Sequence, residues 1–85
     1  MVKLEIFVMD DCWSCEESRR IAAEARVRFP GVEVALLDLE SSDRRPPEVF
    51  AAPTYVLDGT IVSLGNPRRE ELWKRITRQI RNNGA

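Results

Sequence analysis

Two cysteines separated by two residues lie where a strand pattern gives way to a helix pattern. Cys12 and Cys15 enclose Trp13 and Ser14, and they are the only cysteines among the 85 residues. A helix that begins at this point has unpaired backbone N–H groups at its N-terminus, and its dipole adds a partial positive charge there. Both features favour a thiolate, so this pair is the candidate centre of any cysteine chemistry.

The composition indicates a soluble globular protein with no bulk attraction for nucleic acid or membranes. Hydrophobic residues make up 44% of the chain, charged residues 32%, and the formal net charge is −1. We interpret residues 1–85 as a single domain, and no apolar run approaches the roughly 20 residues that cross a bilayer. The N-terminus lacks a signal-peptide pattern, which predicts a cytoplasmic protein. There a Cys-x-x-Cys pair is expected to be catalytic or metal-binding.

Hydrophobic periodicity predicts a strand, a helix and a second strand in the first half of the chain. Residues 2–9 alternate as a strand, residues 13–29 repeat at helical spacing, and residues 32–38 form a buried strand. Pro30-Gly31 ends the helix. One face of the first strand carries Val2, Leu4, Ile6 and Val8, and the other carries Phe7 and Met9. Such a unit should be parallel and right-handed.

The second half predicts a short helix, a hairpin and a long helix. We predict a loop in residues 40–50, followed by one or two helical turns around Glu48–Phe50. Asp58-Gly59 between two alternating runs, 54–57 and 60–64, is a strong hairpin signal. Asn66 is the expected cap of the last helix, which Asn83-Gly84 should end. Its predicted buried stripe is Leu72, Trp73, Ile76 and Ile80.

This element order, with a Cys-x-x-Cys pair opening the first helix, resembles the thioredoxin-like superfamily over roughly residues 2–81. Ala52-Pro53 at the start of the third strand and Gly65 after the fourth add to the resemblance. It implies a minimal thioredoxin-like α/β fold, with a four-stranded mixed sheet in the order 2-1-3-4 and the first and last helices on one face. It also implies that the Ala52–Pro53 peptide bond is cis.

The activity that the resemblance implies is thiol–disulfide exchange. Cys12 would attack a substrate disulfide, and Cys15 would resolve the mixed disulfide, leaving the pair oxidised. Disulfide-containing proteins would be the substrates of this electron carrier, and a reductase or glutathione would supply electrons. No cofactor within the chain and a monomeric state are expected. The residues implied to bind substrate are Trp13, Ser14, Ala52, Pro53 and Gly65.

The chain departs from its relatives at several positions. Thioredoxins proper carry a buried Asp six residues before the first cysteine and a Lys that accompanies it, and here these positions are Ile6 and Leu36. Glutaredoxins hold glutathione with two segments, and at these positions the chain has Ala51-Ala52-Pro53 and Leu64-Gly65-Asn66. Asp10 and Asp11 precede the pair, and their carboxylates should disfavour a thiolate on Cys12.

Other interpretations of the pair remain open. The fold could be a non-catalytic binding module, or a dimer could hold a metal or Fe–S centre through Cys12 and Cys15, because one chain supplies two thiolates where structural zinc needs four ligands. Trp13 could face substrate or pack at the rim. We interpret three arginine pairs as solvent-exposed and not as contacts to nucleic acid, because acidic residues balance their charge. They are Arg19-Arg20, Arg44-Arg45 and Arg68-Arg69.

Overall fold

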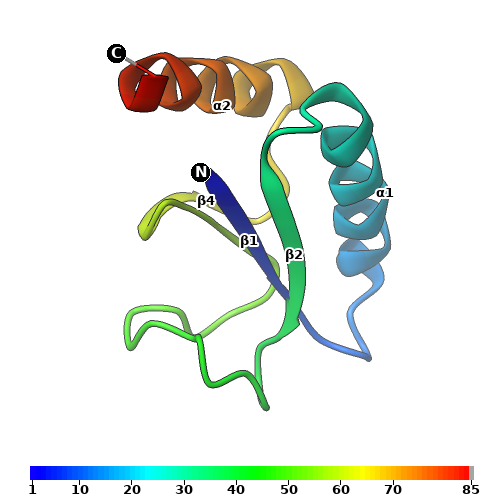
Figure 1. Ribbon diagram of the computed structural model, residues 1–85. Helices are drawn as coiled ribbons and strands as arrows, with labels where there is room; N and C mark the ends of the chain where they lie inside the picture. Colours follow the sequence, from blue (N-terminus) through cyan, green and yellow to red (C-terminus); the bar gives the residue numbers. More distant parts are fainter. Residues whose placement is uncertain (85) are drawn as a thin grey trace.

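The structure is a computed structural model that describes residues 1–84, and it contains a four-stranded sheet and two long helices (Figure 1). The strands lie in the order β2-β1-β3-β4, with β1 parallel to β2 and the other pairs antiparallel. This order confirms the predicted sheet. The elements in chain order are β1 (Lys3–Val8), α1 (Trp13–Arg28), β2 (Glu33–Asp38), β3 (Thr54–Leu57), β4 (Thr60–Leu64) and α2 (Arg69–Gly84).

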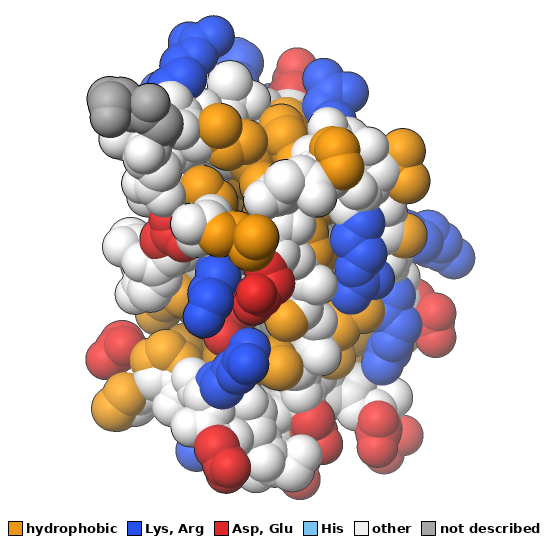
Figure 2. Space-filling model, in the orientation of Figure 1, with side chains coloured by type: hydrophobic (Ala, Val, Ile, Leu, Met, Phe, Trp, Pro, Cys, Tyr) orange, Lys and Arg blue, Asp and Glu red, His pale blue; other side chains and the backbone are white. Residues whose placement is uncertain are grey.

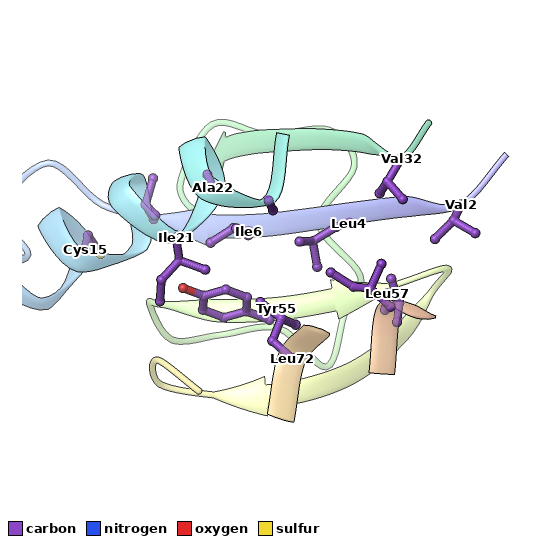
Figure 3. Packing of buried hydrophobic residues seen from close by; sticks show 13 residues of the cluster. Val2, Leu4, Ile6, Cys15, Ile21, Ala22, Val32, Tyr55, Leu57 and Leu72 are labelled. Atoms are coloured by element: carbon purple, nitrogen blue, oxygen red, sulfur yellow. The ribbon is translucent and has the colours of Figure 1, made fainter. Parts of the chain in front are cut away.

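Both helices pack on the same face of the sheet, as predicted. The even-numbered side chains of β1 meet the buried side of α1 and two residues of α2, Leu72 and Ile76, in one cluster (Figure 3). Tyr55 and Leu57 of β3 complete this cluster. Burying a large apolar side chain contributes about 1.5–3 kcal/mol, so this face holds most of the hydrophobic stabilisation. The buried residues of α1 are Cys15, Ser18, Ile21, Ala22 and Ala25.

A long segment, not a helix, covers the opposite face. Phe7 and Val56 pack there against Leu39 and Val49 from the segment between β2 and β3. The predicted short helix around Glu48–Phe50 is wrong, because residues 39–53, all of which the structure describes, form turns and no helix. A single turn forms there, in which the Val49 N–H donates to the Pro46 carbonyl at 3.0 Å, and a helix cannot continue far because Pro53 disfavours helical geometry at Ala52.

The hairpin forms at Asp58-Gly59, as predicted. Both residues have positive φ, 47° and 84°, as the primed turns of tight hairpins require. The Asp58 carboxylate also binds outside the turn: it accepts hydrogen bonds from the backbone N–H of Lys3 at 2.8 Å and from the side chains of Gln79 and Asn83 at 2.9 and 3.2 Å. These bonds, led by that from Lys3, lower the pKa of Asp58. The turn therefore links β1 to the end of α2.

The last helix differs from the prediction at its start and ends where predicted. It begins at Arg69, not beside Asn66, because the Asn66 side chain is committed to other partners. It ends at Gly84, within the predicted stop at Asn83-Gly84. Ile80 is 40% exposed and does not belong to the buried stripe. Trp73 is partly buried, and its ring lies 5.7 Å from the ring of Phe29 at the end of α1.

Arg69 joins the two helices through ion pairs. Its guanidinium lies 2.7 Å from Glu24 and 2.9 Å from Glu17, both on α1. These contacts lower the pKa of both carboxyl groups, because Arg69 donates hydrogen bonds to their charged forms. The hydrogen bonds that Arg69 donates to Glu24, and then the one to Glu17, raise the pKa of the guanidinium. All three side chains are partly exposed, so solvent and salt screen this network.

The surface carries charges of both signs. On the face that Figure 2 shows, basic and acidic side chains are interspersed and do not separate into large patches of one sign. Within residues 1–84, no helix is both long and apolar enough to cross a membrane.

Candidate active site

Cys12 and Cys15 are joined by a disulfide at the start of α1. Cys12 is the N-cap residue, with extended backbone angles, and Cys15 lies one turn further along, where its N–H donates to the Cys12 carbonyl at 3.0 Å. The two sulfurs differ in access, because Cys12 is partly exposed and Cys15 is 0% exposed within the core. The fold thus gives the pair one accessible and one protected member.

The Ala52–Pro53 peptide bond is cis, as the resemblance implied. Pro53 is buried at the entrance to β3, and its carbonyl accepts a hydrogen bond from the N–H of Gly65 at 2.8 Å. Gly65 has a φ of 88°, a conformation that favours glycine. Ala52 is partly buried and packs against the cluster that contains Cys15. The structure therefore brings Ala52, Pro53 and Gly65 together beside the core that holds the cysteine helix.

Two residues between the cysteines occupy different environments. Trp13 is 89% exposed, so the structure favours a surface-facing side chain over one packed at the rim. Ser14 is half-buried, and its hydroxyl oxygen lies 3.5 Å from the Cys12 sulfur. Phe50 and Leu64, which the sequence did not single out, are 79% and 71% exposed. These two lie three residues before Pro53 and one residue before Gly65 in the chain.

A partly buried polar network that sequence reasoning missed lies next to the first turns of α1. The Asn66 carbonyl oxygen accepts hydrogen bonds from the hydroxyls of Ser18 at 2.6 Å and Tyr55 at 2.8 Å. The Asn66 amide nitrogen donates to the Ser14 carbonyl at 2.7 Å. Burial raises the pKa of Tyr55, whose ring lies in the core with its hydroxyl toward α1 (Figure 3). The one available signal was Ser18, a polar residue at helical spacing from the apolar residues Cys15 and Ala22.

The site has no acid–base pair in the positions where thioredoxins proper carry one. Ile6 is completely buried and lies directly opposite Leu36 in the pairing of β1 with β2. The carboxylates nearest to Cys12 in the chain, Asp10 and Asp11, are on the surface, as is Glu16. The interior behind the disulfide is therefore apolar apart from the Asn66 network. Within residues 1–84, no group of three or more His, Cys, Asp or Glu side chains is placed to bind a metal ion.

No protein-family model matches the chain. Two archaeal proteins are similar to it over nearly their whole length. The chain is 28% identical to a thioredoxin from Methanocaldococcus jannaschii over 82 residues, which cover 93% of this chain and 96% of that one. It is 26% identical to a probable thioredoxin from Methanothermobacter marburgensis over 83 residues, 94% of this chain and 98% of that one.

Solved structures show the same fold. The thioredoxin of Fasciola hepatica superposes with a TM-score of 0.71 at 24% identity, covering 91% of this chain and 79% of that one. The oxidised form of mitochondrial thioredoxin 3 from Saccharomyces cerevisiae gives a TM-score of 0.69 at 24% identity, with 89% and 76% coverage. Together with the element order and the cis peptide bond, these superpositions establish the fold.

Proposed function

Because the chain is a thioredoxin-like dithiol–disulfide oxidoreductase, we propose that it reduces disulfide bonds in other proteins and carries electrons to them from a reductase. One observation supports this most directly. The disulfide joins an accessible cysteine to one that is 0% exposed. A pair that only stabilised the fold would need no such difference in access, whereas a nucleophile and a resolving thiol do.

The reaction proceeds by two exchanges of sulfur partners. The Cys12 thiolate attacks one sulfur of the substrate disulfide, forms an intermolecular disulfide and releases the other substrate sulfur as a thiolate. Cys15 then attacks the Cys12 sulfur, which forms the Cys12–Cys15 disulfide and releases the second substrate sulfur, and the proton of Cys15 passes to a released substrate thiolate. Two electrons pass to the substrate, and a dithiol donor returns them to the pair.

Substrate binding follows from what surrounds Cys12. An extended segment of the client would lie along Ala52 and Pro53, where the Ala52 backbone would pair with it. Gly65 borders this segment without a side chain, and Trp13 offers an exposed aromatic surface next to the attacking sulfur. Ser14 contacts that sulfur. Aromatic residues supply large contact areas with few rotatable bonds, so Trp13 is the side chain expected to contribute most to client affinity.

A dithiol reductase is a better electron donor for this site than glutathione. Glutathione carries two carboxylates, and the charged side chains that flank Cys12 in the chain are the acidic residues Asp10, Asp11 and Glu16. Like charges at close range repel, which should weaken glutathione binding. We place the reaction in the cytoplasm, where thiols are kept reduced.

The test is the reduction of insulin disulfides by dithiothreitol, followed as turbidity. Wild-type protein should accelerate the reaction, and Cys12→Ser and Cys15→Ser should each return it to the uncatalysed rate. Val27→Ser is the matched control, because it introduces a serine at a position on α1 that is 84% exposed and outside the site. It should retain wild-type activity. Acceleration that survives Cys12→Ser would refute the proposal.

A further inference from the structure

The side chain of Asn66 connects three parts of the protein that meet at the active site. Its carbonyl oxygen holds Ser18 on α1 and Tyr55 on β3, and its amide nitrogen holds the Ser14 carbonyl between the two cysteines. The residue before it, Gly65, is hydrogen-bonded to the Pro53 carbonyl. Asn66 therefore fixes the first turn of the cysteine helix relative to the strand that begins at the cis-proline.

The orientation of this amide follows from its partners. Ser14 contributes a backbone carbonyl, which accepts hydrogen bonds and cannot donate, so the Asn66 nitrogen must face it. The Ser18 hydroxyl has one hydrogen and lies 2.6 Å from the Asn66 oxygen but 3.5 Å from the Ser14 oxygen. It therefore donates to Asn66, and Asn66 is the main side-chain donor to Ser14.

The Ser14 carbonyl belongs to the same peptide group as the N–H of Cys15. Because Cys12 is the N-cap residue, this N–H is in the third helical position, and in the disulfide form it donates to the Cys12 carbonyl at 3.0 Å. A hydrogen bond accepted by a peptide carbonyl polarises the peptide and strengthens its N–H as a donor. Once the disulfide is reduced, this N–H lies in the position from which a helix N-terminus stabilises the side chain of its N-cap residue, here a thiolate on Cys12.

We propose that Asn66 is a positioning residue that increases the thiolate fraction of Cys12 through its hydrogen bond to the Ser14 carbonyl. This inference rests on the proposed function, in which Cys12 is the attacking thiolate. No basic residue stands beside Cys12 in the sequence to stabilise its thiolate. The proposal assigns part of that stabilisation to the side-chain amide of Asn66. Asp10, Asp11 and Glu16, the charged residues closest to Cys12 in the chain, act in the opposite direction.

The test measures the alkylation rate of Cys12 by iodoacetamide between pH 5 and 10 in reduced Asn66→Ala. A strengthening of the charge-assisted hydrogen bond to the Cys12 thiolate by about 10–30% predicts that the thiolate fraction at pH 7 falls by up to about fivefold in this variant. The midpoint of the pH profile should rise, and the reduction potential of the pair should become more negative, since the dithiol form is less stabilised.

Tyr55→Phe and Ser18→Ala are the matched controls. Each removes one bond to the Asn66 oxygen and keeps the bond from its nitrogen to Ser14. Both should leave the alkylation midpoint within about 0.2 pH units of wild type, although they lower thermal stability. If Asn66→Ala does not fold, the double variant Asn66→Leu/Tyr55→Phe removes the same donor without leaving the tyrosine hydroxyl unpaired, and it should give the same shift.

Two results would overturn the inference. One is an unchanged midpoint in folded Asn66→Ala. The other is a midpoint that shifts equally in Tyr55→Phe, since that would show a general loosening of the site. Alkylation requires no client or reductase, so failure of the proposed function would appear separately, as wild-type protein that does not reduce insulin.

Discussion

Replacing Tyr55 by Phe tests how the polar network contributes to stability. The substitution keeps the buried ring and removes only the hydroxyl that donates to Asn66 at 2.8 Å. The Asn66 oxygen retains its 2.6 Å bond from Ser18, so no acceptor is left unpaired. The free energy of unfolding should fall by about 1 kcal/mol, the net value of one neutral hydrogen bond. For a domain of this size, that lowers Tm by about 4–8 °C.

Asn66→Ala should cost more, about 2–4 kcal/mol, because it leaves the buried Tyr55 hydroxyl without its partner. The effect of Tyr55→Phe should then change sign. In the Asn66→Ala background, it removes an unpaired hydroxyl and should be neutral or stabilising. Thermal and urea unfolding of the four proteins in this double-mutant cycle measure both values. If Tyr55→Phe costs the same in both backgrounds, the hydroxyl is not stabilised by Asn66, and the reasoning fails.

Three further predictions concern the hairpin, the helix pair and the exposed tryptophan. Asp58→Asn should destabilise the protein at pH 7. Because the pKa of Asp58 is lowered from 3.8, the difference in unfolding free energy from wild type should shrink as the pH falls below 4. Urea unfolding across pH 2–7 measures this difference, and a difference that does not depend on pH would contradict the prediction. Arg69→Ala should lower Tm more at 20 mM than at 500 mM salt, because salt screens the partly exposed ion pairs to Glu17 and Glu24. Equal losses of Tm at both salt concentrations would show that the stabilisation by Arg69 is not ionic. Trp13→Ala should leave Tm unchanged, since the side chain is 89% exposed. It should raise KM for insulin but not KM for a small aromatic disulfide. Equal effects on both KM values would show that Trp13 does not contribute to client binding.

Much of the fold follows from local patterns in the sequence. The alternation in residues 2–9 predicts both faces of the central strand, because its even positions join the helix-covered core and Phe7 joins the opposite cluster. Asp58-Gly59 predicts the hairpin because few other residue pairs tolerate positive φ at both positions. The sequence also predicts that the cysteine pair lies at the start of α1, because the hydrophobic pattern changes from strand to helix spacing at that point.

The errors arise where tertiary contacts override local preference. Asn66 precedes a proline and a helix, which is the usual context of an N-cap, but partners from α1 and β3 bind its side chain first. These partners, Tyr55, Ser18 and Ser14, are 11, 48 and 52 residues away in the chain, so no local pattern shows them. The segment around Val49 lacks a helix although Val49 itself is buried, because burial against Phe7 requires only a turn.

The central claim is that Cys12 attacks and Cys15 resolves. Its most direct test is to mix each reduced single-cysteine variant with a disulfide-bonded protein and to count covalent adducts by mass spectrometry. Cys15→Ser should accumulate a mixed disulfide through Cys12, because the resolving thiol is missing. Cys12→Ser should accumulate none while folded, since Cys15 is 0% exposed. Equal trapping by both variants, or trapping through Cys15 alone, would contradict the account.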